Sequence, residues 1–433
     1  MRRAGLAAGA ALLSLHGLAC ATAPALTRVP SVRIRALAER AEAARELRFL
    51  APVRADEVAT EGVSALLEQE LDLLMPPAQL RREEALAKAL GLLPERADLR
   101  STLLGFEAEA VAGFYTPTGG RLYVVQGAAA AGGGEDTAVL VHELGHALQD
   151  QHTSLIEVTI GIGSNDDLLF ALGAFLEGDA LWTELRDEAQ TSGFPQPSGA
   201  EFAARFEVEA PSGDGVPRLL RESFLSQYPL GYALAHGLVE RGGVAALTAA
   251  LSDPPLSSEE LIHPERYLVP SKRRAVALFP ESVDGFAPQS GCALVASSSY
   301  GELGLRVRLA EGGIDAALAR RAADGWDGDR AWLLDCKQSA VLAWLLQFDS
   351  EADARELEVL APRAGWPAQS GLAPPALVER RGTRVLLSAG LDAAGRAFLL
   401  ERLEPVRTSG LRALLREHPE ILERAAEIRR ASE

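Results

Sequence analysis

The segment from His142 to His146 reads His-Glu-Leu-Gly-His and combines residue types that can hydrolyse a bond with the help of a metal ion. In an α-helix, residues four apart lie about 40° apart around the axis and about 6 Å along it, so both imidazoles can reach one ion. Glu143 is turned by about 100° from His142, so its carboxylate lies beside the metal and can accept a proton from an attacking water. The spacing predicts a Zn²⁺ site with His142 and His146 as ligands and Glu143 as general base.

Apolar residues surround this motif on nearly every side of the predicted helix, over residues 138–148. A helix of this kind is buried in the protein core. Two imidazoles and a carboxylate at a buried position need a compensating partner, and a zinc ion supplies one. A chance match in a surface helix is the alternative, and the apolar surroundings argue against it.

Two residues compete for the place of the third ligand. His152 would complete a metzincin-like motif, but Gln149 occupies the place of the glycine that lets a metzincin helix end. If the helix continues, His152 lies about 15 Å along the axis from His142, beyond reach of the same ion. Glu177 lies in an apolar helix, where a carboxylate is costly unless it is paired or binds metal. The sequence favours Glu177, with a helix residue that reaches solvent as the alternative.

The segments 142–152 and 176–180 together resemble a largely uncharacterised family of bacterial secreted gluzincin-like metallopeptidases. The segments 111–115, 121–125 and 254–267 resemble the same family. The similarity covers about residues 66–267 well and the C-terminal third loosely. It implies His142, His146 and Glu177 as metal ligands and Glu143 as general base, and it names no established substrate.

One position departs from the best-studied gluzincins, in which an aspartate four residues after the ligand glutamate orients a histidine. Leu181 occupies this position here. Because histidine ligands usually need such an acceptor, Asp150, Asp179 and Glu184 are candidates. Asp150 is the first choice, since it lies four residues beyond His146 on the same helical face. A solvated residue at the end of the helix is the alternative for Asp150.

A peptidase also needs a donor for the oxyanion that forms as water attacks the carbonyl. His263 and Tyr267 are candidates because they lie in an irregular segment next to prolines, and loops often carry such groups. A structural hydrogen bond is the alternative for His263. The predicted strand over 121–125 could present its edge to an extended peptide or pair within a sheet.

Hydrophobic periodicity predicts an α+β protein that is mostly helical. A zincin-like catalytic domain over 30–275 has a small β-hairpin or sheet before the His-Glu-x-x-His helix, and an α+β module follows over 285–433. Helices are expected over 32–50, 58–74, 77–92 and 167–189, and another begins after the capping residues 135–137 and runs through the motif. Strands are expected over 113–115, 121–125, 330–336, 339–348 and 384–389.

Residues 1–23 have the charged start and apolar stretch of an export signal. The residues before Cys20 resemble a lipoprotein cleavage box, and ordinary signal cleavage after it is the alternative. The protein is therefore expected in the periplasm, on the outer surface as a lipoprotein, or outside the cell. No later segment offers about 18 uninterrupted apolar residues, so a lipid on Cys20 is the expected membrane attachment.

Net charge bears on the kind of partner, and the cysteines bear on disulfide formation. The net charge is −17 and no long run of Lys or Arg occurs, which excludes a nucleic-acid binding stripe. Once Cys20 is set aside, Cys292 and Cys336 remain. They either form one disulfide in an oxidising compartment or stay as buried thiols.

Two functions follow from these residues. The first is a zinc-dependent metalloendopeptidase that cleaves a peptide or protein substrate in the cell envelope or outside the cell. The second is a non-catalytic envelope lipoprotein with a structural or vestigial zinc site, whose C-terminal module binds a partner. Glu143 favours the first, because a structural site has no use for that carboxylate. Leu181 favours the second.

Overall fold

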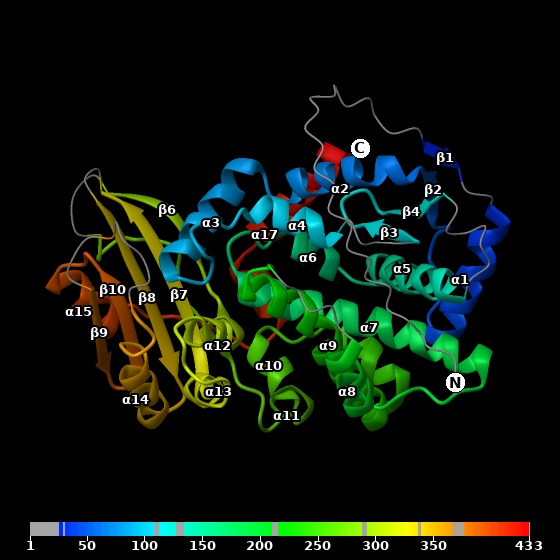
Figure 1. The fold of residues 1–433 in the computed structure, drawn as a ribbon. Coiled ribbons are helices and arrows are strands. Elements are labelled where there is room, and N and C mark those ends of the chain that lie inside the picture. Colours follow the sequence, from blue (N-terminus) through cyan, green and yellow to red (C-terminus); the bar gives the residue numbers. More distant parts are fainter. Residues whose placement is uncertain are drawn as a thin grey trace.

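A computed structural model describes residues 26–28, 31–107, 112–126, 134–209, 215–287, 292–336, 339–366, 372 and 376–432. The predicted export signal at 1–23, with Cys20, lies outside these residues. No helix in the described part of the chain is long and apolar enough to cross a membrane. The predicted α+β class is confirmed, with helices around two larger sheets (Figure 1).

A small sheet lies against the helix that carries the histidines. Its strand order is β1 (Leu26–Arg28), β2 (Arg54–Val58), β4 (Arg121–Val125) and β3 (Gly113–Thr116). The predicted hairpin is present as the antiparallel pair β3–β4, while β2 and β4 run parallel. Because β4 has a neighbour on each side, pairing within a sheet is the alternative realised at 121–125. The free edge of this sheet next to the motif helix belongs to β3.

Five helices form the layer below this sheet. They are α1 (Ser31–Arg45), α5 (Gly134–His152), α7 (Asp166–Ser192), α8 (Gly199–Glu209) and α9 (Arg218–Ala250). Helices α7 and α9 cross at very short range, since a Cβ added to Gly231 would lie 1.8 Å from the carbonyl oxygen of Ala174. The crossing therefore requires glycine at position 231.

Further helices connect these elements. They are α2 (Thr60–Leu74), α3 (Pro77–Leu90), α4 (Leu99–Glu107), α6 (Leu155–Gly161), α10 (Ser258–Ile262) and α11 (Pro264–Leu268). The helix expected over 32–50 ends earlier, at Arg45, because Glu46 adopts a positive φ of 55°. A residue with a side chain rarely continues a helix from that conformation.

The C-terminal third is built on an antiparallel sheet with the strand order β6, β7, β8, β10, β9. Its strands are β6 (Ala293–Ser298), β7 (Trp326–Asp335), β8 (Ala340–Phe348), β9 (Ala376–Arg381) and β10 (Arg384–Ala389). Its helices are α12 (Gly301–Glu311), α13 (Ala316–Ala323), α14 (Glu351–Leu360) and α15 (Ala393–Glu401). A disulfide joins Cys292 and Cys336, so the first of the two cysteine alternatives is realised.

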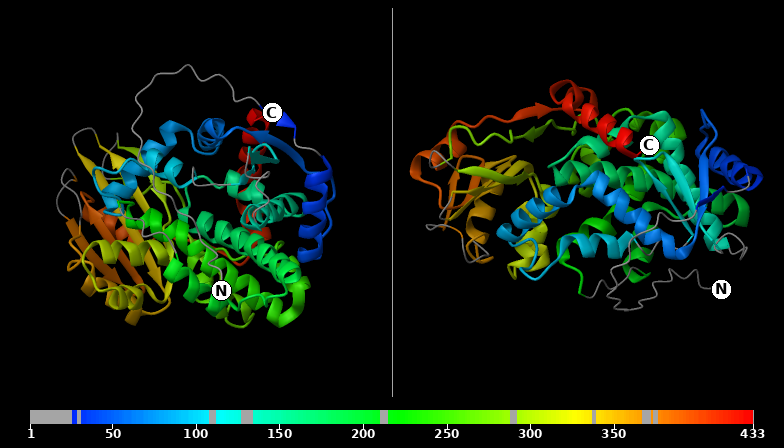
Figure 2. Two further views of the ribbon diagram at one scale, coloured as in Figure 1. Left: turned by 45° about the vertical axis from the view of Figure 1, so that its right-hand side comes forward. Right: turned by 90° about the horizontal axis from the view of Figure 1, so that it is seen from above.

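The remaining elements are β5 (Val276–Leu278), β11 (Val406–Thr408), α16 (Leu411–Glu417) and α17 (Glu420–Ser432). Figure 2 shows α17, in red, back beside the N-terminal half, where it packs on α6. Conversely, Leu86 and Leu90 of α3 share a core with Trp344 of β8. The packing therefore does not follow the predicted division between 275 and 285, because each part contributes a helix to the other.

Candidate metal centre

Helices α5 and α7 bring His142, His146 and Glu177 together. One ligand atom from each residue lies within 4.8 Å of the other two. The Nε2 atom of His142 is 3.2 Å from Glu177 Oε2, and the Nε2 atom of His146 is 3.5 Å from Glu177 Oε1. The three side chains remain 11%, 15% and 25% exposed, so the cluster can be reached from solvent.

Local packing explains why these side chains face each other. On one side of α5, Val141 and Leu144 are fully buried against Leu122 of β4, which turns the histidines toward α7. At the contact between the two helices, a Cβ on Gly145 would lie only 3.2 Å from the Cα of Ala180. Small residues at these two positions let α5 and α7 come close enough for one ion to bridge them.

The second nitrogen of each imidazole faces an acceptor. His142 Nδ1 lies 3.1 Å from Glu184 Oε2, and His146 Nδ1 lies 3.0 Å from Gln149 Oε1. Both rings can therefore donate from Nδ1 and keep Nε2 free for a metal, as histidine ligands require. Glu184 was one of the three candidates for this task. Asp150, the first choice, is instead hydrogen bonded to Tyr115 and Arg429, so that choice is wrong.

The charges of the cluster compensate one another. Burial works against an imidazolium, but hydrogen bonds with Glu177 and Glu184 raise the pKa of His142 well above its ordinary value. Burial also favours a neutral Glu177, yet the charge of His146 and a hydrogen bond with His142 hold the pKa of Glu177 below its ordinary value. The carboxylate is thus ionised beside two basic rings. This is the donor set of zinc sites that have two histidines and one glutamate.

Glu143 lies beside the cluster and is held by the edge strand. The backbone N–H of Tyr115 donates to Glu143 Oε2 at 2.7 Å. Burial raises the pKa of Glu143, while the nearby His146 and His142 act in the opposite direction. A carboxylate with a raised pKa and one oxygen fixed by a backbone donor is suited to accept a proton at its other oxygen.

Tyr228 of α9 lies close enough to the cluster to feel its charges, and it was not selected from the sequence. The negative charge of Glu177, followed by burial and the charge of Glu143, raises the pKa of the Tyr228 phenol. The phenol therefore stays protonated and can donate a hydrogen bond. Phe206 of α8 packs against its ring, with 6.0 Å between the ring centroids. Gly231 is the one nearby residue in the sequence that hints at the position of Tyr228, because it permits the close crossing of α7 and α9.

The comparisons with known proteins concern another part of the chain. A family model described as a domain of unknown function, DUF8575, matches residues 293–397. The match begins at β6, ends inside α15 and includes all five strands of the C-terminal sheet. No curated protein and no solved structure matches the chain. The matched family thus covers the C-terminal sheet and none of the residues around His142, His146 and Glu177.

His152, the less favoured candidate for the third ligand, lies away from the cluster. Helix α5 continues through Gln149 to His152, as expected from the absence of a glycine at position 149. His152 Nε2 lies 2.6 Å from the carbonyl oxygen of Arg48. Its described contact is therefore a structural one.

The two proposed oxyanion donors are also not brought to the cluster. His263 Nε2 lies 3.1 Å from Glu302 Oε1, and the Tyr267 hydroxyl donates to the carbonyl oxygen of Asp253 at 2.7 Å. The His263 contact joins the corner between α10 and α11 to α12, and the Tyr267 contact reaches the turn that follows α9. The structural alternative for His263 therefore describes its observed environment, and neither residue keeps its predicted catalytic role.

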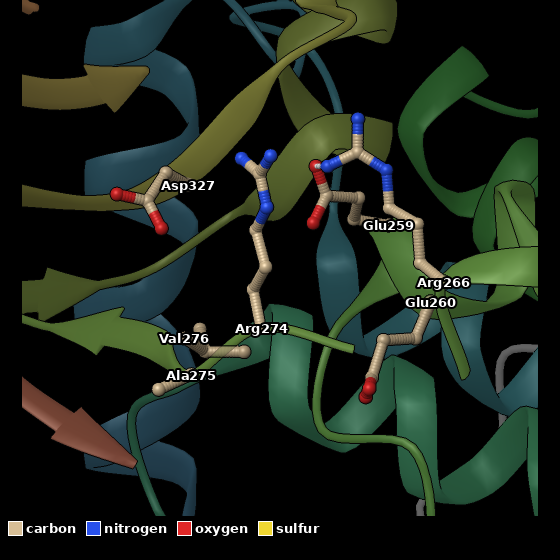
Figure 3. A pocket seen from close by; sticks show the side chains of 7 residues that line it. All are labelled: Glu259, Glu260, Arg266, Arg274, Ala275, Val276 and Asp327. Carbon is tan, nitrogen blue, oxygen red and sulfur yellow. Dashed lines mark hydrogen bonds and ion pairs between the residues drawn. The ribbon is translucent and has the colours of Figure 1, made fainter. Parts of the chain in front are cut away.

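The segment 254–267 instead anchors the start of α7. The backbone N–H of Ser258 donates to Asp167 Oδ1 at 2.9 Å. A small pocket of about 10 Å³ lies beside this segment (Figure 3), lined by Glu259, Glu260, Arg266, Arg274, Ala275, Val276 and Asp327. It has room for no more than about one water molecule. This part of the resemblance thus corresponds to a structural joint.

Proposed function

We propose that the protein is a zinc-dependent metallopeptidase with a zincin-like catalytic domain, similar to the gluzincins. The observation that supports this most directly is the convergence of His142, His146 and Glu177 within 4.8 Å, with Glu143 held beside them by Tyr115. The donor set fits Zn²⁺, and both Nδ1 atoms face acceptors. Zn²⁺ bound there supplies a Lewis acid for the attack of water on a peptide carbonyl.

Glu143 acts as the general base. Its Oε2 accepts from the Tyr115 N–H, which leaves Oε1 to take the proton from the attacking water. The raised pKa of Glu143 makes the carboxylate a stronger base than a solvated one. The same oxygen then delivers the proton to the leaving amine as the peptide bond breaks.

Tyr228 stabilises the oxyanion that develops on the carbonyl oxygen. Its raised pKa keeps the phenol protonated, and the charges that raise this pKa belong to Glu177, Glu143 and Glu184. A hydrogen-bond donor that acts on the oxyanion only in the transition state is worth about 3 to 4 kcal/mol. Tyr228 thus replaces His263 and Tyr267 in the proposal.

A substrate peptide lies extended along β3. Tyr115 directs its N–H to Glu143, so the free edge of this strand lies next to the general base. Unpaired groups on a strand edge bind a peptide through main-chain hydrogen bonds. A pocket of about 150 Å³ is lined by Tyr115, Ala147 and Asp150 together with residues 51–54, which leaves space for a substrate side chain.

The enzyme is proposed to act outside the cytoplasm. The disulfide between Cys292 and Cys336 supports this, because such bonds persist in oxidising compartments. The export signal and the lipid anchor on Cys20 remain predictions.

A peptide library of diverse sequence tests the proposal. The wild type should carry about one zinc per chain and cleave library peptides, lose both after chelation, and regain both when Zn²⁺ is restored. Glu177→Ala should bind no zinc, whereas Glu188→Ala, an exposed glutamate on the same helix, should behave like the wild type. If the zinc-loaded wild type cleaves no peptide, the proposed activity is wrong. Retained zinc in Glu177→Ala would reject the ligand assignment.

A further inference from the structure

The hydrogen bond from His146 to Gln149 is the first step of a longer buried chain of contacts. The amide nitrogen of Gln149 donates to the carbonyl oxygen of Leu176 and to Asp179 Oδ2, both at 2.9 Å. Because both donors of this amide are used, its oxygen is the atom left to face His146 Nδ1 at 3.0 Å. His146 then donates from Nδ1, so Nε2 is the ring nitrogen that remains directed at the cluster.

Asp179 is held by an arginine from the N-terminal helix. Arg45 Nε donates to Asp179 Oδ1 at 2.6 Å, and the two side chains are only 1% and 3% exposed. A second guanidinium nitrogen of Arg45 donates to Thr248 Oγ1 of α9 at 2.8 Å. Arg45 thus joins α1 to both α7 and α9. Removing one partner of such a buried charge pair strongly destabilises the fold, because the other charge is left uncompensated.

We propose that Arg45, Asp179 and Gln149 form a positioning relay that fixes the Nδ1-protonated tautomer of His146 and so sets the metal affinity of the site. The relay does for His146 what Glu184 does for His142. It supplies the acceptor that Leu181 cannot. The inference rests on the proposed zinc site, and it adds α1 to the elements that this site requires.

The relay works through the orientation of one amide. With Arg45 in place, Asp179 is held as an acceptor for the Gln149 amide nitrogen, which keeps that nitrogen turned away from His146. Without Arg45, the Asp179 side chain loses the hydrogen bond that fixes its orientation and can turn away from Gln149. The Gln149 amide can then turn and present its N–H groups to His146. That orientation favours a proton on Nε2, which blocks the metal.

A neighbouring ion pair provides a matched control. Arg40 lies on the same helix and makes two hydrogen bonds to Asp187 of α7, at 2.9 and 2.5 Å. This pair also ties α1 to α7, but within the described residues its hydrogen bonds do not reach Gln149 or the histidines. Its loss should loosen α1 without changing the His146 tautomer.

The test measures zinc affinity of the full-length protein by competition with a chelator, together with thermal unfolding of the zinc-free form. Gln149→Met and Arg45→Leu should each weaken zinc binding by about 10- to 100-fold, and Arg45→Lys should recover part of the loss. Arg40→Leu should lower the unfolding temperature but leave the zinc affinity unchanged. Circular dichroism identifies any variant that fails to fold, and Gln149→Met changes no charge and keeps the side-chain volume.

The outcomes separate this inference from the proposed function. A wild type that binds no zinc removes the metal site itself. A wild type that binds zinc, with unchanged affinity in Gln149→Met, overturns the relay alone. Equal losses of affinity in Arg45→Leu and Arg40→Leu would also overturn it, because they would show a general effect of loosening α1.

Discussion

Tyr115 connects Glu143, the proposed general base, to the last helix of the described chain. Its backbone N–H donates to Glu143 at 2.7 Å, and its hydroxyl donates to Asp150. Arg429 of α17 donates to the other oxygen of Asp150 at 2.6 Å. A helix that follows the C-terminal sheet in sequence therefore helps to fix the strand beside the motif at 142–146.

Arg429→Gln is expected to lower kcat/KM on the order of tenfold while zinc stays at one per chain. The substitution leaves Asp150, which is 8% exposed, without its cation and near Glu157, so Tyr115 loses a firm anchor. Arg430→Gln is the control, because this neighbouring arginine is exposed. Steady-state kinetics and metal analysis decide the matter, and equal kinetics in both variants would show that α17 does not position the strand.

Tyr228→Phe is expected to reduce kcat by about 10²- to 10³-fold with little change in KM, since the phenol acts on charge that develops only in the transition state. Tyr232→Phe removes a hydroxyl one turn away on α9 that donates to the carbonyl oxygen of Pro197, and it should leave kcat unchanged. Kinetics on a peptide from the library provide the measurement. A wild-type kcat in Tyr228→Phe would remove this residue from the proposed mechanism.

The sequence predicts the elements of the site better than their supports. Helical spacing was enough to place His142 and His146 on one face, and the cost of a buried carboxylate was enough to single out Glu177. The structure brings these three together. Local periodicity carries such information because each argument depends on one helix at a time.

The supporting contacts could not be predicted in the same way. Asp150 lies on the expected face of α5, but β3 and α17 approach that face and take its hydrogen bonds. Arg45 lies 134 residues from Asp179, and nothing in either helix pattern indicates the pair. These contacts depend on how helices cross, which the spacing of apolar residues within one helix does not determine.

The fold shows the same limit. The strands β7, β8 and β10 were expected from their apolar runs, whereas the exchange of α3 and α17 between the two parts of the chain was not. Each of these helices has an apolar face that could be buried on any neighbouring surface. The surface on which each helix packs is decided by tertiary contacts alone.

Asp167 should make the protein less stable as pH rises. Burial raises the pKa of this carboxyl to about 7. Between about pH 4 and pH 7, the folded state therefore binds a proton that the unfolded state has lost. Over this range, each unit of rising pH lowers the free energy of unfolding by up to about 1.4 kcal/mol. Urea unfolding measures the free energy of unfolding of Asp167→Asn and of the wild type at each pH. Relative to the wild type, the variant should be more stable at pH 8 than at pH 5. The contributions of the other carboxyl groups largely cancel in this comparison. A difference that does not vary with pH would contradict the burial argument.

The turnover of zinc-loaded Glu143→Gln tests the central claim most directly. The glutamine can still accept the Tyr115 N–H but cannot take a proton from water, and the ligands His142, His146 and Glu177 are unchanged. At one zinc per chain, the account predicts a fall in kcat of about 10²- to 10⁴-fold relative to the wild type on the same peptide. Turnover equal to that of the wild type at the same zinc content would contradict it.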